Sequence, residues 1–171
     1  EQLFDVNNTT FEQAQNLTES ISYATLTNGI PNGSLIKLSD NLSIDSDLLI
    51  VSENISIDQA TVQSSNDLEI NGRLYVNDSS VAADSLSVVA NGLFNQLEAI
   101  YVGNSSTIEI NGDISIDGTG KSESSSDDLT SGSPNGVHIA DSTIRSISGN
   151  IKIVSENTAI HQATVQSSND L

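Results

Sequence analysis

Residues 62–116 read VQSSNDLEINGRLYVNDSSVAADSLSVVANGLFNQLEAIYVGNSSTIEINGDISI, and features of this stretch recur every twenty residues. Asn-Gly pairs stand at that spacing: Asn71-Gly72, Asn91-Gly92 and Asn111-Gly112. Apolar residues keep the same spacing and predict buried columns that include Val62, Leu68, Ile70, Leu74, Val88, Phe94, Val102, Ile108, Ile110 and Ile114. Between them apolar and polar residues alternate, which indicates strands with one buried face. A twenty-residue unit cannot bury its inner face alone, so the pattern predicts units that stack into a coil.

Composition limits both the core and the partners. The chain has 171 residues, enough for one domain, with 4 % aromatics and no Trp, Met or Cys, so the core must consist of small aliphatics. The formal net charge is −18, which argues against nucleic acid and anionic membranes as partners and favours cations. No apolar run approaches the roughly 18 residues of a membrane span, so we expect no membrane insertion. The lack of Cys and the abundance of Ser, Thr, Asn and Asp favour an extracellular or cell-surface location.

Residues 1–33 differ in pattern from the rest of the chain. Residues 9–12 (TTFE) have the form of a capping box, and apolar residues follow at helical spacing, which predicts an amphipathic helix over about residues 10–23. We expect this helix to cover the open end of the coil, and an ordinary surface helix is the alternative. The sequence NGIPNG at residues 28–33 then predicts a turn, so the coil should occupy residues 34–171.

Residues 34–58 read SLIKLSDNLSIDSDLLIVSENISID and predict alternating strands broken by Asp and Asn. With the capped helix and the turn, they resemble the opening of the pectin-lyase-like right-handed parallel β-helix superfamily, which includes many secreted adhesins. The resemblance is one of pattern, over residues 10–116 and 137–171. It implies an all-β fold, a right-handed parallel β-helix whose coil length matches the twenty-residue repeat, and an N-terminal capping α-helix. It also implies that the Asn-Gly pairs form a structural asparagine ladder at one turn.

A second repeat lies on top of the first. Residues 50–68 return as residues 153–171 with 16 of 19 positions identical at an offset of 103, which is about five coils plus three residues. Identity that includes surface positions indicates a tandem duplication. The second unit begins at about residue 151. We therefore expect either that the chain belongs to a longer tandem array, or that its last strand is a terminal copy of an internal strand. Between the copies, residues 118–136 lack large aliphatics apart from Leu129, so we predict a polar loop in preference to a weak coil.

Three carboxylates are candidate metal ligands. Asp58, Asp78 and Glu98 also lie twenty residues apart, and in one column about 5 Å apart they would favour a bound Ca²⁺. A different alignment places Asn77, not Asp78, beside Asp58. Calcium-loop motifs are absent from the sequence, so a solvated acidic face is the alternative to a Ca²⁺ site.

Asn-X-Ser/Thr sequons are frequent in the chain. We identify four of them in the coil as candidate glycosylation sites: Asn41, Asn54, Asn77 and Asn104. They matter only if the source organism glycosylates exported proteins, and in a chain so rich in Asn, Ser and Thr many sequons arise by chance.

Catalytic patterns are weak in this sequence. The five basic residues are scattered, and His138 and His161 occupy outward positions of predicted strands, with His161 in the place of Asp58 in the second copy. A Ser-His-Asp spacing, a phosphate loop and a Cys/His metal motif are all missing from the sequence. We therefore predict no catalytic residues and no enzymatic activity.

Two functional hypotheses remain. The first is a non-enzymatic secreted structural or adhesive module, a rod-like stalk or filament building block that associates end to end or through tandem copies. The second is a glycan-binding or glycan-cleaving domain on the long face of the coil. The second hypothesis requires a line of exposed aromatics or convergent carboxylates, and Tyr75 and Tyr101 do not share the twenty-residue register.

Overall fold

The structure is a computed structural model that describes residues 2–5, 23–27, 35–90, 98–119 and 136–169. In these residues the chain is all β, and its strands form an 11-stranded and a 6-stranded sheet. Every strand pair is parallel. The predicted all-β class and the parallel pairing are therefore confirmed.

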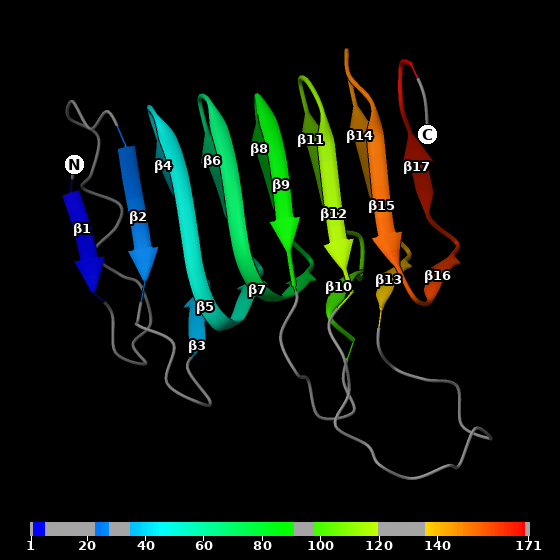
Figure 1. The fold of residues 1–171 in the computed structure, drawn as a ribbon, viewed down its shortest axis with the longest axis horizontal. Coiled ribbons are helices and arrows are strands. Elements are labelled where there is room, and N and C mark those ends of the chain that lie inside the picture. The colour runs from blue at the N-terminus through cyan, green and yellow to red at the C-terminus, as the bar shows by residue number, and fades with distance from the viewer. Residues whose placement is uncertain (1, 6–22, 28–34, 91–97, 120–135, 170–171) are drawn as a thin grey trace, which may run out of the picture.

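The strands form three faces, and we call one pass of the chain over the three faces a rung (Figure 1). The first face holds β1 (Gln2–Asp5), β2 (Tyr23–Thr27), residues 47–51 of β5 (Asp47–Asp58), residues 67–71 of β7 (Asp67–Asn77), β9 (Ser85–Val89), β12 (Ile114–Gly118) and β15 (Ile151–Ser155). The second face holds β3 (Leu35–Leu38), residues 54–58 of β5, residues 73–77 of β7, β10 (Ile100–Gly103), β13 (Val137–Ala140) and β16 (Thr158–His161). The third face holds β4 (Leu42–Ile44), β6 (Thr61–Ser64), β8 (Ser80–Ala83), β11 (Thr107–Ile110), β14 (Thr143–Ser146) and β17 (Thr164–Gln166).

Aliphatic side chains fill the interior in columns that follow the strand pairs. On the second face one column contains Ile57, Val76, Val102 and Ile139, each of which is 0 % exposed. A similar column on the third face contains Val62, Val81, Ile108 and Ile144. Burial of each such side chain stabilises the fold by about 1.5–3 kcal/mol before entropy is counted. The residues predicted for buried columns are all buried, except Phe94, which lies outside the described residues.

The columns differ from the constant twenty-residue register. Leu68 pairs with Leu86, whereas Val88 pairs with Ile70. Ile108 lies on a different face from both Leu68 and Val88. On the first face the offset between paired residues is 20 from β5 to β7, 18 to β9, 28 to β12 and 37 to β15. The strands keep a similar length while the corners take up extra residues, so equivalent positions are not equally spaced in sequence.

This pairing also corrects the length of the longer repeat. Ile50 and Ile153, the first residues of the two copies, belong to one column, which passes through Ile70, Val88 and Ile116. The offset between the two copies therefore corresponds to four rungs, not to about five coils.

Inward serines at the corners satisfy the backbone where the strands end. Ser64 Oγ donates to the Ser46 carbonyl oxygen at 2.6 Å, and Ser142 Oγ donates to the Ala140 carbonyl oxygen at 2.7 Å. Both hydroxyls belong to buried side chains. A buried carbonyl without a partner would be costly, so these short polar residues allow tight corners inside an aliphatic core.

Two predicted segments lie largely outside the described residues. Residues 10–22 of the helix predicted for residues 10–23 lie outside the described residues, and its last residue, Tyr23, begins strand β2. In the predicted polar loop, β12 ends at Gly118 and β13 begins at Val137, with residues 120–135 outside the described part. In the described part of the chain, no helix has the length and apolar character needed to cross a bilayer.

The inward columns end at an exposed rung. Ile160 pairs with Ile139 and continues its column, yet Ile160 is 48 % exposed. Ile153 and Val165, which continue the columns of the first and third faces, are only partly buried. The end of the stack that carries β15, β16 and β17 therefore presents aliphatic side chains to solvent.

The two neighbouring isoleucines of this column give a matched test of the stack. We expect Ile139→Ala to lower the free energy of unfolding by about 2–5 kcal/mol, because it opens a cavity between packed rungs. We expect Ile160→Ala to cost less than about 1 kcal/mol, because its side chain is half exposed. Urea denaturation followed by circular dichroism measures both, and equal losses would contradict the described packing.

Candidate functional site

Four ring side chains form a line on the outside of the second face, and we call them the aromatic column: Tyr75, Tyr101, His138 and His161. The rings of Tyr75 and Tyr101 stack, with centroids 5.0 Å apart and planes 12° apart. His138 meets Tyr101 edge to face at 5.4 Å, and His161 meets His138 at 6.1 Å. These four residues belong to β7, β10, β13 and β16, which are strands of the second face (Figure 1).

The alternation of the strands turns these rings outward. Tyr101 stands between Ile100 and Val102, both 0 % exposed, and His138 stands between the buried residues Val137 and Ile139. In a β-strand successive side chains point to opposite faces, so two buried neighbours place the residue between them on the surface. The outward position predicted for His138 is therefore confirmed.

The pairing of the two tyrosines corrects the sequence-based expectation. Tyr101 pairs directly with Tyr75, so the two residues do share a register, although their spacing in sequence is longer than the repeat. The difference arises because more residues separate the first and second faces in the rung of β9 and β10 than in the rung of β7. The two tyrosines thus form a stacked, partly exposed pair on the outside of the second face.

Charged groups flank the aromatic column. Glu98 Oε1 lies 3.4 Å from His138 Nδ1, and both side chains are about one-third exposed, at 34 % and 30 %. Arg73 Nε donates to the Glu98 carbonyl oxygen at 2.8 Å, which fixes the backbone beside the column. Burial lowers the pKa of Arg73, and the carboxylate of Glu98 opposes this shift. The site therefore combines stacked rings with hydrogen-bonding groups of both signs.

The environment also raises the pKa of Tyr101. Burial is the largest cause, followed by the Tyr75 phenol and the carboxylates of Glu98 and Asp141. All of these disfavour a negative charge on the Tyr101 oxygen. Tyr101 therefore stays a neutral phenol, able to donate a hydrogen bond, to a higher pH than a solvated tyrosine.

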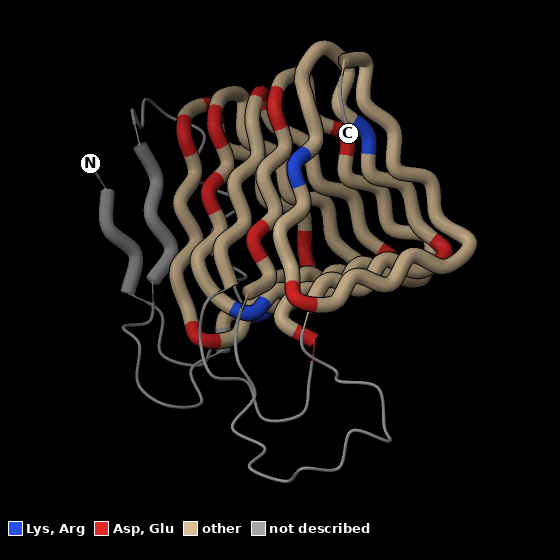
Figure 2. The backbone as a smooth tube through the Cα atoms, turned by 45° about the vertical axis from the view of Figure 1, so that its right-hand side comes forward, with Lys and Arg blue, Asp and Glu red and all other residues tan. Residues whose placement is uncertain are grey.

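The candidate metal ligands do not form one cluster. Asp58 pairs with Asn77, and Asn77 Nδ2 donates to Asp58 Oδ1 at 2.7 Å, so the alternative alignment in which Asn77 lies beside Asp58 is confirmed. Asp78 lies at the corner that follows β7, and Glu98 lies beside His138. Over the described ranges, no three His, Cys, Asp or Glu side chains are arranged to hold a metal ion. Acidic residues are spread over successive rungs (Figure 2).

The Asn-Gly pairs occupy different corners. Gly72 lies between the first and second faces at φ +143°, where an added Cβ would clash with the Ser52 carbonyl oxygen, so this position requires glycine. Asn111 lies between the third and first faces, where its Nδ2 donates to Asp84 Oδ1 at 2.7 Å. Asn91 and Gly92 lie outside the described residues. The described pairs are therefore structural, but they do not stack into one ladder.

The structure contains a regular corner between the second and third faces that the sequence patterns did not predict. Each successive rung places one or two left-handed residues there: Gln59, Asp78, Asn104 with Ser105, Asp141 and Gln162. Polar side chains connect neighbouring rungs at this corner, since Asn104 Nδ2 donates to Asn77 Oδ1. The sequence signal is a short triplet of a small residue, Ser or Thr, and Val or Ile, as in Ala60-Thr61-Val62 and Ser142-Thr143-Ile144. Its unequal spacing hides it from a search at a constant period.

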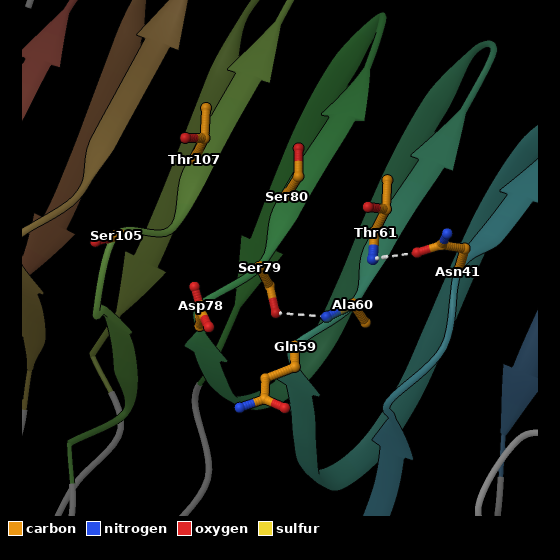
Figure 3. Close-up of a pocket in the computed structure, with 9 residues that line it drawn as sticks. All are labelled: Asn41, Gln59, Ala60, Thr61, Asp78, Ser79, Ser80, Ser105 and Thr107. Atoms are coloured by element: carbon orange, nitrogen blue, oxygen red, sulfur yellow. Dashed lines mark hydrogen bonds between the residues drawn. The ribbon is translucent and has the colours of Figure 1, made fainter.

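A shallow polar groove runs beside this corner (Figure 3). One cavity of about 400 Å³ is lined by Asn41, Gln59, Ala60, Thr61, Asp78, Ser79, Ser80, Ser105 and Thr107. Within it Asn41 Oδ1 accepts a hydrogen bond from the Thr61 N–H at 3.2 Å, and Ser79 Oγ accepts one from the Ala60 N–H at 3.0 Å. These polar groups serve the corner itself, and the groove lacks aromatic side chains.

The candidate glycosylation sites differ in their surroundings. Asn41 and Asn104 are exposed, whereas Asn54 and Asn77 are partly buried. The Nδ2 atoms of Asn77 and Asn104 both donate hydrogen bonds along the corner between the second and third faces. Asn41 is exposed, and its Oδ1 accepts a hydrogen bond from the Thr61 N–H, so among the described contacts its Nδ2 is the most accessible of the four.

The raised pKa of Tyr101 gives a direct test of the site. A phenol whose folded pKa lies above its unfolded value of about 10 stabilises the fold below that pH, and this stability is lost as pH rises through the folded pKa. We expect phenolate absorbance to show a step above the pH of about 10 at which a solvated tyrosine ionises. Tyr101→Phe should remove this late step, and its persistence in that variant would contradict the assignment.

The chain was compared with protein-family models, with curated proteins and with solved structures, and it matches none of them.

Proposed function

We propose that this chain is a right-handed parallel β-helix that serves as a non-enzymatic structural and adhesive module outside the cell or at its surface. The parallel pairs on three faces support this architecture. Parallel strands in one sheet are joined by right-handed crossovers in about 98 % of cases, which favours the right hand. The pattern resemblance to the pectin-lyase-like superfamily belongs to the same proposal.

One observation carries the rod-like role: the inward columns run without a break through successive rungs of the described chain. Ile57, Val76, Val102 and Ile139 form one such column, and each of them is 0 % exposed. Each further rung would bury the apolar side chains and pair the backbone of the rung before it. Such a stack gains length by addition at an end, which suits a stalk or a filament building block.

Composition supports the proposed location and partners. The net charge of −18 disfavours a polyanionic partner. Because the chain contains no Cys, its stability outside the cell does not depend on disulfides. Solvated Asp and Glu on successive rungs keep the long sides of the stack apart by repulsion, so association along the axis of the stack is favoured over association side by side.

The end-to-end association is tested by sedimentation velocity over a wide range of protein and Ca²⁺ concentrations. We expect larger species to form as concentration rises, and we expect Ile160→Asp to abolish them, because it places a charge in the apolar end. Gln166→Asp on the outward side of the same rung is the matched control and should leave association unchanged. A wild-type chain that stays monomeric throughout would refute this role.

A second candidate function is glycan binding, and the aromatic column favours it. The stacked rings of Tyr75 and Tyr101 form a partly exposed apolar ridge against which C–H groups of a sugar can pack. Glu98 and His138 stand beside the rings as hydrogen-bonding groups for sugar hydroxyls. An extended polysaccharide that follows the column from rung to rung would contact each ring in turn.

A polysaccharide panel tests this candidate by affinity electrophoresis. We expect Tyr101→Ala to weaken the affinity for a binding polysaccharide about tenfold. The substitution removes one ring from the line, and a loss of about 1.4 kcal/mol of binding free energy corresponds to a tenfold change. Tyr101→Phe keeps the ring and should retain most of the affinity, and Gln63→Ala on the third face serves as the control for a distant outward residue. If no member of a broad panel is retained, or if all three variants bind alike, the aromatic column is not a glycan site.

A further inference from the structure

The strand pairing beneath the aromatic column holds its two tyrosines side by side. Tyr75 pairs directly with Tyr101, and the residues that follow them, Val76 and Val102, pair with each other. Both valines are 0 % exposed, so the close-packed core fixes the backbone of the two strands at this point. The tyrosine rings stack with centroids 5.0 Å apart and planes 12° apart. Neighbouring rungs therefore keep two phenol rings together without any movement of the strands.

Two further contacts hold the Tyr101 ring in this orientation. His138 on the next rung meets the ring edge to face, with centroids 5.4 Å apart. Gly103 lies on the same outward side of β10 as Tyr101, yet Gly103 is buried. A Cβ added at Gly103 would clash with the ring and the hydroxyl oxygen of Tyr101, so the ring lies across this glycine. The position of the ring therefore requires that Gly103 has no side chain.

The same two rings can be reached from solvent. Tyr75 and Tyr101 are both partly exposed on the outside of the second face. A small oxidant in solution can therefore take an electron from either phenol. Holding two reacting groups next to each other turns a reaction between two molecules into one within a single molecule, which raises its rate greatly. A radical formed on one ring thus has its coupling partner already in place on the next rung.

We propose that Tyr75 and Tyr101 form a site of oxidative cross-linking, at which a one-electron oxidant joins the two rings by a carbon–carbon bond and staples β7 to β10. Each phenol loses one electron and one proton, and the two radicals couple at ring carbons next to the hydroxyl-bearing carbons. The hydrogen on each coupled carbon then moves to the ring oxygen, which restores both phenols. Hydrogen peroxide with a haem peroxidase is an oxidant of this class, because one peroxide takes up the two electrons and two protons and becomes two water molecules.

Such a link would stabilise this chain in the way that a disulfide stabilises others. The chain contains no Cys, so disulfides cannot join its rungs. A bond between residues 75 and 101 closes the segment between them into a loop in the unfolded state and lowers the entropy of that state. The rings must turn from a stacked to an edge-to-edge arrangement, and their place outside the core leaves room for this turn. The inference is independent of the proposed structural and glycan-binding roles.

The experiment treats the full chain at low concentration with a haem peroxidase and hydrogen peroxide, and follows dityrosine fluorescence, intact mass and the peptide map of the monomer. We expect a monomer that has lost two hydrogen atoms and carries one link between the peptides of Tyr75 and Tyr101. The purified product should have a Tm about 5–10 °C above that of the untreated chain. Tyr75→Phe and Tyr101→Phe should each lose the product. Tyr23→Phe removes the third tyrosine of the chain and should react like the wild type.

A further variant tests the ring geometry while it keeps all the tyrosines. Gly103→Ala should displace the Tyr101 ring and slow the formation of the link severalfold, with an unchanged circular dichroism spectrum. A rate equal to that of the wild type would contradict the inference. It would also fail if the wild-type chain gave only links between chains, or if the link within the chain persisted in Tyr101→Phe. A linked monomer that melts no higher than the untreated chain would show that β7 is not stapled to β10.

Discussion

Parallel pairing of each rung with the rungs on both sides is the interaction on which the rest of the structure depends. It fixes the distance between successive passes of the chain at about 4.8 Å and forces equivalent residues to lie on one another. Inward positions therefore become continuous columns, such as the one from Ile57 through Val102 to Ile139. The core consists of small aliphatics because each rung leaves room only for side chains that pack against similar side chains in the next rung.

The same pairing explains how much could be predicted from the sequence. Alternation within strands is local, so the buried character of Leu68, Val88 and Ile108 was predictable, together with the all-β class and the parallel stack. Their register was not, because it depends on the number of residues in the corners, which the pairing does not constrain. The twenty-residue spacing that relates Asn71 to Asn111 joins two different corners, and nothing local to either residue indicates this.

Residues at outward positions are not constrained by packing in the core, and the candidate site consists of such residues. The core fixes that Tyr75 and Tyr101 point outward but places no demand on which residues stand there. Three rings in register, Tyr75, Tyr101 and His138, are therefore not a by-product of packing in the interior. Its discovery needed the true spacing between the two tyrosines, which follows from the extra residues between β9 and β10. Sequence alone could name the residues of this site but could not bring them together.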